Sequence, residues 1–328
     1  MEPNRNLSEA QPRLSSRFWG VVTLVLIFFA SAGVTLAYLS NIRVQAPTAS
    51  QAAAAVLTED PFAGIQLTGE SAYVLDLTSG HVLYSLNPDI QLPLASLTKI
   101  ALVLAASEVL SPDTVITIPR NTSPKGSAEH LGAGEQWRVG DVIAFILVAS
   151  SNEGAQILAE AANDALAVKY PNAPKNSSTD ATLWRMNDLA KKLGLTRTYF
   201  LNANGLDLST TQAGAFGSAR DTATLFAYAA TTSPDIFAGT ARDGLLLLSE
   251  SGNKTSAFNT DKALEAIPGV IMGKTGYTDL AGGNLAVLFD VGPAHPVVAV
   301  IMHSSEQGRF DDMKKLVRTT QAAVAAGR

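Results

Sequence analysis

The order of strand-like and helix-like stretches predicts an α+β fold for this chain. Residues 72–77 and 81–86 are rich in strand formers and flank Thr78-Ser79-Gly80, which favours a β-hairpin. The middle of the chain is mostly helical in pattern, with helices expected near 183–193 and 219–230. Strand-like stretches return at 269–273, 283–290 and 297–302. A closing helix is expected over 309–326. Strands grouped at both ends of a helical middle are typical of the α+β class.

Composition excludes several classes of function. The chain has 328 residues, 47% hydrophobic and 16% charged, which allows one large domain or two small ones plus a tail. The net charge of −5 implies no basic face, so no nucleic-acid partner is expected. There are no cysteines, which excludes thiol catalysis, disulfides and cysteine-ligated zinc. The four histidines are scattered outside any paired ligand spacing, so we expect neither a metal nor a cofactor.

The N-terminal segment has the pattern of a membrane anchor. Residues 18–39 carry no charge, and as a helix at about 1.5 Å per residue they would span the roughly 30 Å hydrocarbon core. Arginines precede this run, so the positive-inside rule predicts a cytoplasmic tail at 1–17 and everything after residue 39 outside the plasma (inner) membrane. A cleaved signal peptide is the alternative, although its apolar region is usually about 7–15 residues.

A tether is expected between this span and the folded domain. Residues 40–68 contain few large apolar side chains and include an alanine run, which is typical of a linker. The globular domain is therefore expected to cover 69–328, beginning with the hairpin described above.

The chain's first candidate site lies where a proline precedes an apolar helix. Pro93 is followed by Ser96 and Lys99 and then by the apolar run 100–106, a pattern that predicts a buried helix with Ser96 in its first turn. Residues three apart share one helix face, so the Lys99 amine can reach the Ser96 hydroxyl. A lysine with a depressed pKa acts as the base for a serine nucleophile. Backbone N–H groups at the helix start would be available to an oxyanion.

Two further polar stretches interrupt apolar segments. Ser150 and Asn152 stand between the apolar run 142–148 and a helix expected over 153–162; the alternative to a site here is an N-cap for that second helix. Lys274-Thr275-Gly276 stands between two predicted strands, and the alternative is an ordinary strand end with a turn glycine. A second Ser-x-x-Lys, at 251–254, is surrounded by turn formers and is expected to be loop.

Taken together and in this order, the three motifs match the set found in penicillin-binding proteins and class A β-lactamases. Over residues 69–325 the chain resembles the serine D-alanyl-D-alanine carboxypeptidases, the low-molecular-mass penicillin-binding proteins of peptidase family S11. Further matching stretches are Met186-Asn187, Asn202 to Leu206, Ser218 to Asp221, Asn259-Thr260 and Gly276 to Asp279. No C-terminal β-rich domain is expected after the last helix, and the N-terminal span is expected to replace a C-terminal amphipathic anchor.

This resemblance implies a penicillin-binding protein/β-lactamase-like transpeptidase fold. Its antiparallel sheet would combine the N-terminal hairpin with the C-terminal strands under the last helix. A helical lobe would be inserted in the middle, and the motifs would line a cleft between lobe and sheet.

The resemblance also implies a role for each site residue. Ser96 would form an acyl-enzyme, with Lys99 as its base. Ser150 would relay the proton to the leaving amine and Asn152 would orient Lys99. Lys274 would also be catalytic, as a second cation that helps to hold Lys99 neutral and attracts the carboxylate of the substrate. Substrate binding would further involve Thr275, Gly276, Tyr277 and Arg309, with Thr275 and Arg309 at the carboxylate. The backbone N–H groups of Ser96 and Tyr277 would bind the oxyanion.

The implied substrate is a peptidoglycan stem peptide ending in D-Ala-D-Ala, with β-lactams as covalent inhibitors and cell-wall maturation as the setting. A DD-endopeptidase would use the same residues, and a catalytically silent wall-binding domain is a further alternative. A class A β-lactamase needs a glutamate in a Glu-x-x-Leu-Asn stretch. The comparable Leu201-Asn202 here has Thr198 at the glutamate position, which disfavours that family.

Overall fold

The structure, a computed structural model, describes residues 60–120 and 131–327. The described residues belong to one compact unit. The tail, the anchor and most of the linker expected from the sequence lie outside the described residues. Among those that are described, no helix is both long and apolar enough to cross a membrane.

A five-stranded antiparallel sheet is formed by the two ends of this unit. Its strand order is β10-β11-β12-β1-β2, and its strands are β1 (Ser71–Asp76), β2 (Val82–Leu86), β10 (Val270–Thr278), β11 (Gly282–Asp290) and β12 (Pro296–Ser304). The predicted hairpin is thus confirmed, and β1 joins it to the C-terminal strands by pairing with β12.

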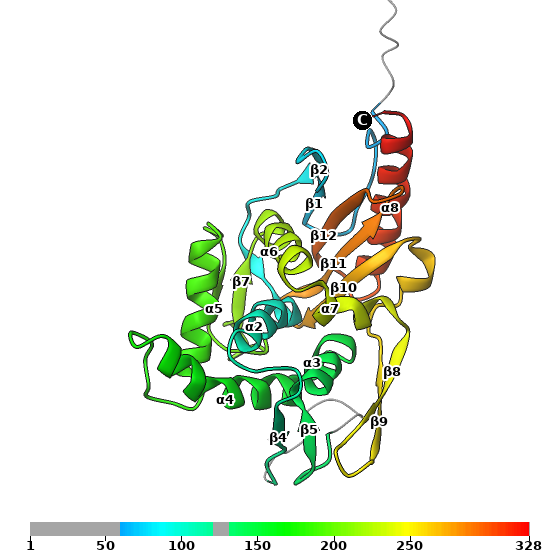
Figure 1. Cartoon of the computed structure of the whole chain (residues 1–328). Helices are drawn as coiled ribbons and strands as arrows, with labels where there is room; N and C mark the ends of the chain where they lie inside the picture. The colour runs from blue at the N-terminus through cyan, green and yellow to red at the C-terminus, as the bar shows by residue number, and fades with distance from the viewer. Residues whose placement is uncertain (1–59, 121–130, 328) are drawn as a thin grey trace, which may run out of the picture. The chain divides into compact units, whose positions relative to one another are not determined.

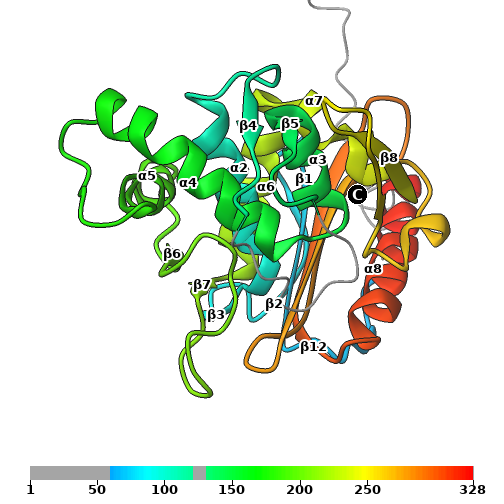
Figure 2. The same cartoon turned by 90° about the horizontal axis from the view of Figure 1, so that it is seen from below.

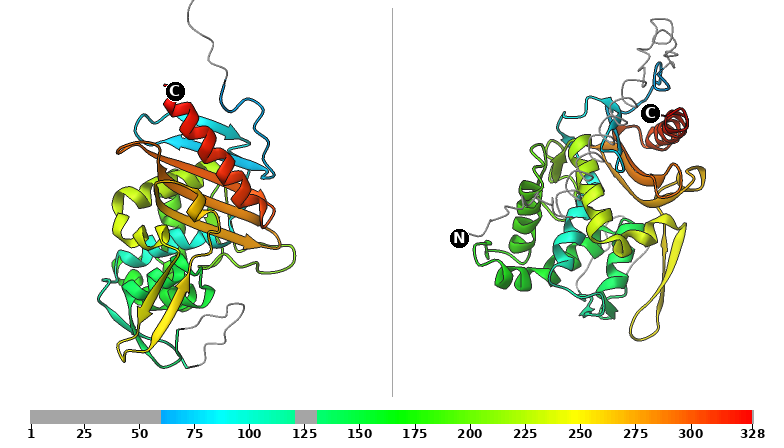
Figure 3. Two further views of the ribbon diagram at one scale, coloured as in Figure 1. Left: turned by 90° about the vertical axis from the view of Figure 1, so that its right-hand side faces the viewer. Right: turned by 45° about the horizontal axis from the view of Figure 1, so that its top comes forward.

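Successive side chains of a strand point to opposite faces of the sheet, and here both faces are buried in a core. Val298 and Val300 of β12 belong to the core on the helical side, whereas Val297 and Ala299 belong to the core under the last helix, α8 (Gly308–Ala325). Figure 2 shows the resulting layers, with α8 on one side of the sheet and the helical lobe on the other. Figure 3 shows α8 lying across the strands.

The helical lobe is inserted between β2 and β10 (Figure 1). Its main helices are α2 (Thr98–Ser107), α3 (Val139–Val148), α4 (Asn152–Lys169), α5 (Asp180–Lys192) and α6 (Ala219–Thr232). Helix α2 is buried almost all round, as its unbroken apolar sequence predicts. Helix α6 packs against β12 and β1, so it joins the lobe to the sheet.

Short strands and turns complete the unit. They are β3 (Leu92–Pro93), β6 (Tyr199–Phe200) and β7 (Ala215–Gly217) in one small sheet, β4 (Val115–Thr117) with β5 (Gln136–Arg138), β8 (Gly244–Leu248) with β9 (Lys254–Phe258), α7 (Pro234–Phe237), and the 3-10 helices η2 (Ala95–Leu97), η3 (Ala238–Ala241) and η4 (Leu264–Ala266). The β8–β9 ribbon was not predicted. Residues 249–253 connect these two strands, so the first three residues of the second Ser-x-x-Lys lie in the turn, as expected, whereas Lys254 begins β9.

Two boundaries differ from the sequence analysis. The folded part begins before residue 69: Phe62 is 5% exposed and stacks on Tyr84, and the backbone N–H of Thr68 donates to the Asp312 carboxylate at 3.0 Å. These residues pack because α8 offers them an apolar surface and a buried carboxylate, which their own composition does not indicate. The tripeptide 274–276 lies inside β10 and not between two strands, since β10 continues to pair with β11 through Thr278.

Candidate active site

Ser96 lies in a tight turn that its surroundings hold in place. It belongs to η2, directly before α2, and its side chain is half-buried. Ala95 before it has a φ of 47°, a left-handed conformation that costs a residue with a Cβ on the order of 1–3 kcal/mol. Asn284 of β11 donates to two main-chain carbonyls just before Ala95, at 2.9 and 3.1 Å. The sheet therefore fastens the strained turn that presents Ser96.

One helical turn later, Lys99 directs its amine at three oxygen atoms. Its Nζ lies 2.7 Å from each of Ser96 Oγ, Ser150 O and Asn152 Oδ1. The last two are carbonyl oxygens, which can only accept hydrogen bonds. A neutral amine has two N–H groups and one lone pair, so the carbonyls take both N–H groups. The lone pair is left for the Ser96 hydroxyl, which is the arrangement of a nucleophile and its base.

Burial sets the protonation state of Lys99. The side chain is 0% exposed, and desolvation lowers its pKa well below the ordinary value of 10.5. The charge of Lys274 lowers the pKa further, because a second cation disfavours the protonated amine. Both causes favour the neutral form that can accept a proton.

The junction between α3 and α4 supplies two partners of Lys99. Ser150 has a φ of 58°, which turns the chain sharply between the two helices. The N-cap of α4 is Ser151, whose Oγ accepts from the Gly154 N–H at 3.0 Å. The capping alternative raised by the sequence therefore applies to Ser151, and Ser150 and Asn152 remain available to Lys99.

Lys274 and Thr275 approach the same point from β10. The Lys274 Nζ donates to Ser150 Oγ at 2.8 Å and to the Thr275 carbonyl at 2.9 Å. Burial, followed by the charge of Arg309, lowers the pKa of Lys274 to about 7. The Thr275 hydroxyl shares a 2.6 Å hydrogen bond with that of Thr260. The Ser150 hydroxyl thus lies between two amines, since Lys99 Nζ is 3.5 Å from it.

Gly276 brings β10 directly against the turn of Ser96. A Cβ at Gly276 would lie 2.9 Å from Leu94 O and 3.2 Å from Ser96 N, so only glycine permits this approach without displacement. Arg309 donates to the Gly276 carbonyl at 2.6 Å, and its guanidinium lies 5.6 Å from the centre of the Tyr277 ring. Arg309 is buried, whereas the Tyr277 side chain is 46% exposed. All nine residues named by the sequence therefore meet at the junction of lobe and sheet.

Three residues of this junction were not assigned a role from the sequence. Asn284 secures the Ser96 turn, and Thr260 pairs with Thr275. Asp261 is buried, and its Oδ2 has no hydrogen-bond partner among the described residues. Burial raises the pKa of this carboxyl, and its negative charge raises that of Lys274. Asn284 had a detectable signal, because it is a lone amide in an otherwise apolar strand.

The fold and the site define the class: this is a protein of the penicillin-binding protein/β-lactamase type, with a serine and a buried lysine at the junction of sheet and helical lobe. The family model for D-alanyl-D-alanine carboxypeptidase, peptidase S11, matches residues 54–306. The chain belongs to this family, as its motifs indicated.

Individual relatives agree with this assignment. The chain is 30% identical to D-alanyl-D-alanine carboxypeptidase DacF of Bacillus subtilis over 76% of its own length and 61% of that protein, so it spans less than two thirds of this relative. It is 32% identical to a D-alanyl-D-alanine endopeptidase of Pseudomonas aeruginosa over 48% of its length and 49% of the relative. Its fold matches penicillin-binding protein D2 of Listeria monocytogenes in the cefotaxime-bound form, with a TM-score of 0.63, 25% identity, and 78% and 98% of the two chains covered.

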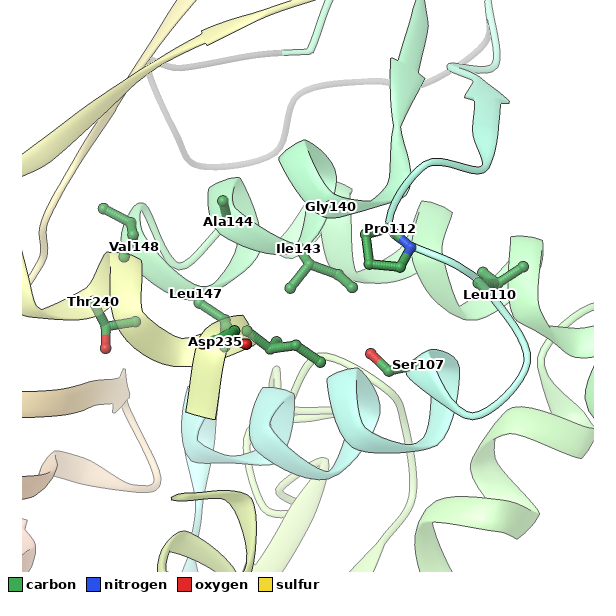
Figure 4. Close-up of a pocket in the computed structure, with 12 residues that line it drawn as sticks. Ser107, Leu110, Pro112, Gly140, Ile143, Ala144, Leu147, Val148, Asp235 and Thr240 are labelled. Atoms are coloured by element: carbon green, nitrogen blue, oxygen red, sulfur yellow. The ribbon is translucent and has the colours of Figure 1, made fainter. Parts of the chain in front are cut away.

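A separate hollow of about 360 Å³ is lined by α3, by the end of α2 and by residues within 235–240. Figure 4 shows Ile143 of α3 facing Ser107, at the end of α2, across this space, with Leu147 of α3 beside Asp235. Its lining is mostly apolar and contains neither Ser96 nor the two lysines. This hollow therefore offers no acyl-transfer chemistry and is distinct from the candidate active site.

Proposed function

We propose that this protein is a serine D-alanyl-D-alanine carboxypeptidase that acts on peptidoglycan stem peptides through a Ser96 acyl-enzyme. The single observation that carries the proposal is the 2.7 Å contact between Lys99 Nζ and Ser96 Oγ. In the same arrangement, two carbonyl oxygens accept hydrogen bonds from the Lys99 amine. This contact gives the hydroxyl a base whose neutral form is favoured by burial and by the charge of Lys274.

In the acylation step, Ser96 Oγ attacks the carbonyl of the terminal D-Ala-D-Ala bond and its proton passes to Lys99. The negative charge that forms on the carbonyl oxygen is assigned to the backbone N–H groups of Ser96 and Tyr277. As the C–N bond breaks, the leaving amine takes a proton through Ser150 Oγ, which lies between the amines of Lys99 and Lys274. The products are free D-alanine and the Ser96 ester.

In the second step, water hydrolyses this ester. Lys99 is again the neutral base in reach of the reacting centre, so it takes the proton of the attacking water and returns it to Ser96 Oγ as the ester bond breaks. The shortened stem peptide leaves as a carboxylic acid, which releases its proton to the solvent, and the enzyme regains its starting protonation state.

The sheet side of the site fits the free carboxylate of the terminal residue. Arg309 and protonated Lys274 are cations in a largely desolvated place, where attraction for an anion is stronger than in water. The Thr275 hydroxyl, with Thr260 as its partner, is a further donor. A carboxypeptidase substrate always presents a free carboxylate here, because its scissile bond is the last one of the peptide.

We also propose that β-lactams acylate Ser96, since they resemble the terminal dipeptide, and that hydrolysis of the product is slow. The Thr198 hydroxyl, at the position of the β-lactamase glutamate, donates to Asp221 at 2.9 Å. It cannot serve as a carboxylate base for deacylation. Slow nitrocefin turnover is therefore expected, and rapid turnover would contradict this part of the proposal.

A further part of the proposal concerns location: residues 18–39 anchor the enzyme in the plasma (inner) membrane with the catalytic domain outside. The support is the uncharged run and the arginines before it. Membrane fractionation of the full chain, compared with a chain that begins at residue 40, tests this assignment.

Covalent labelling tests the chemistry. Wild type incubated with fluorescent penicillin should carry a stable label, and mass spectrometry should place it on Ser96. Incubation with a D-Ala-D-Ala peptide should release D-alanine. Ser96→Ala should lose both activities, while Ser251→Ala, in the second Ser-x-x-Lys, should keep them. Retention of label by Ser96→Ala would overturn the assignment of the nucleophile. A cross-linked muropeptide, offered in parallel, reports endopeptidase activity.

A further inference from the structure

The loop 201–214, which connects β6 to β7, keeps its shape through its own hydrogen bonds. The Asn202 side chain donates to the Leu206 carbonyl at 2.8 Å and accepts from the Gly205 N–H at 2.7 Å. The backbone N–H groups of Leu201 and Asn202 both donate to the Gly214 carbonyl, at 2.8 and 3.1 Å, which closes the loop at its base. A loop tied in this way can transmit a constraint from one end to the other.

One side of this loop is seated on the nucleophile turn. Gly205 has a φ of 81°, and a Cβ at this position would lie 1.9 Å from Ala95 O and 2.7 Å from Thr98 Oγ1. These residues lie directly around Ser96. The loop backbone is therefore in close contact with the segment that sets the position of the Ser96 N–H.

The other side of the loop is held by the sheet. Asp207 accepts from the Thr278 hydroxyl at 3.0 Å with one carboxylate oxygen and from the Leu280 N–H at 3.2 Å with the other. The Thr278 hydroxyl in turn accepts from the Ala281 N–H at 3.1 Å, so it fixes the turn that follows β10. Thr278 directly follows Tyr277, whose backbone N–H is the second donor assigned to the oxyanion.

We propose that Asp207 is a positioning residue that sets the distance between the Ser96 and Tyr277 backbone donors by linking the end of β10 to the loop seated on Ala95. This inference rests on the proposed acyl-transfer function. Ser96 belongs to the helical lobe and Tyr277 to the sheet, and the loop spans the two through Gly205 and Asp207. A misplacement of about 1 Å between catalytic groups can cost on the order of 10²-fold in rate, so such a link has a measurable consequence.

The test compares Asp207→Ala and Thr278→Val with wild type in penicillin acylation. Each variant should acylate about 10- to 100-fold more slowly, because an oxyanion donor contributes about 10²- to 10³-fold and is here displaced and not removed. The double variant should be within about threefold of the single ones, since both changes break the same link. Affinity for a peptidyl boronic acid, whose tetrahedral boronate occupies the oxyanion site, should fall in parallel.

Two controls separate positioning from folding. Asp279→Ala removes an exposed acidic side chain two residues from Tyr277, and Thr211→Ala removes a hydroxyl of the same loop that pairs with Ser209. Both should acylate as wild type does. The Tm of each variant is measured, and Asp207→Asn serves if Asp207→Ala does not fold.

Unchanged acylation in Asp207→Ala or Thr278→Val, a loss shared by the controls, or additive losses in the double variant would each overturn the inference. So would a slower acylation with unchanged boronate affinity. If penicillin does not label the wild-type protein, the result would instead contradict the proposed function. The two failures are therefore distinguishable.

Discussion

Lys99 and Lys274 are almost equally buried, but the two sides of the site that carry them differ in their charge. On the helical lobe, the neighbours of Lys99 are a hydroxyl and two carbonyl oxygens, all uncharged. On the sheet, Lys274 shares its surroundings with a second cation, Arg309, and with the buried carboxyl of Asp261. Burial therefore acts on both amines, while the remaining interactions are different.

This difference indicates how one residue type serves two purposes. Burial and, after it, the charge of Lys274 lower the pKa of Lys99 well below 10.5, which favours the neutral amine that a base requires. For Lys274, the charge of Arg309 lowers the pKa and that of Asp261 raises it, and the result is about 7. The Asp261 charge thus favours protonated Lys274, the form that suits a group that binds a carboxylate.

Lys99→Arg should cause the largest loss of activity, and it tests the lobe side of this comparison. A guanidinium does not give up its proton, so it cannot accept one from Ser96. Acylation by penicillin should fall below detection, by more than about 10³-fold. Lys192→Arg, an exposed position on α5, is the matched control and should acylate normally. Substantial acylation in Lys99→Arg would mean that another group is the base.

Arg309→Ala should give the next largest effect, on the sheet side. A charge-assisted hydrogen bond contributes about 1.5–3 kcal/mol, so kcat/KM for a peptide with a free C-terminal carboxylate should drop about 10- to 100-fold. The same peptide with an amidated C-terminus should lose much less. Arg318→Ala, an exposed position on the same helix, is the control. Equal losses on both peptides would remove Arg309 from carboxylate binding.

Thr260→Val should have a smaller effect on the same side. It removes the partner of the Thr275 hydroxyl while keeping the shape of the side chain. With about 0.5–1.5 kcal/mol for one hydrogen bond, kcat/KM for the carboxylate peptide should fall about two- to tenfold. Thr232→Val, which loses a 2.8 Å hydrogen bond to the Tyr228 carbonyl on α6, should show no change. An equal loss in that control would make the Thr260 effect non-specific.

The pH profile of kcat/KM should show the smallest effect and would sharpen the comparison. Carboxylate binding needs protonated Lys274, so activity should decline as pH rises through about 7. The base needs neutral Lys99, so activity should also decline as pH falls through the lowered pKa of that amine. Since the Arg309 charge lowers the pKa of Lys274, Arg309→Ala should move the alkaline limb to higher pH. An alkaline limb that stays at the same pH in Arg309→Ala would mean that the titration of Lys274 does not cause it.

Much of the fold could be predicted from the sequence because its signals are local. The hairpin 71–86, the buried helix after Ser96 and the last helix follow from periodicity and turn residues, and each is confirmed within a few residues. The β8–β9 ribbon could not be predicted, since Leu245 to Leu248 is a short apolar run without strand alternation. The packing of Phe62 could not be predicted either, because it depends on Tyr84, a partner distant in the chain.

The sequence by itself determined the candidates for the chemistry, since Ser96, Lys99, Ser150, Asn152 and the tripeptide 274–276 are recognisable from local spacing. Only the tertiary structure decided the surroundings of these groups: that Ser151 and not Ser150 caps α4, and that the buried Lys99 amine lies 2.7 Å from the Ser96 hydroxyl. The physical reason is that pKa values and hydrogen-bond geometry depend on burial and on charges from segments far apart in the chain. Those distances exist only once the sheet has closed against the helical lobe.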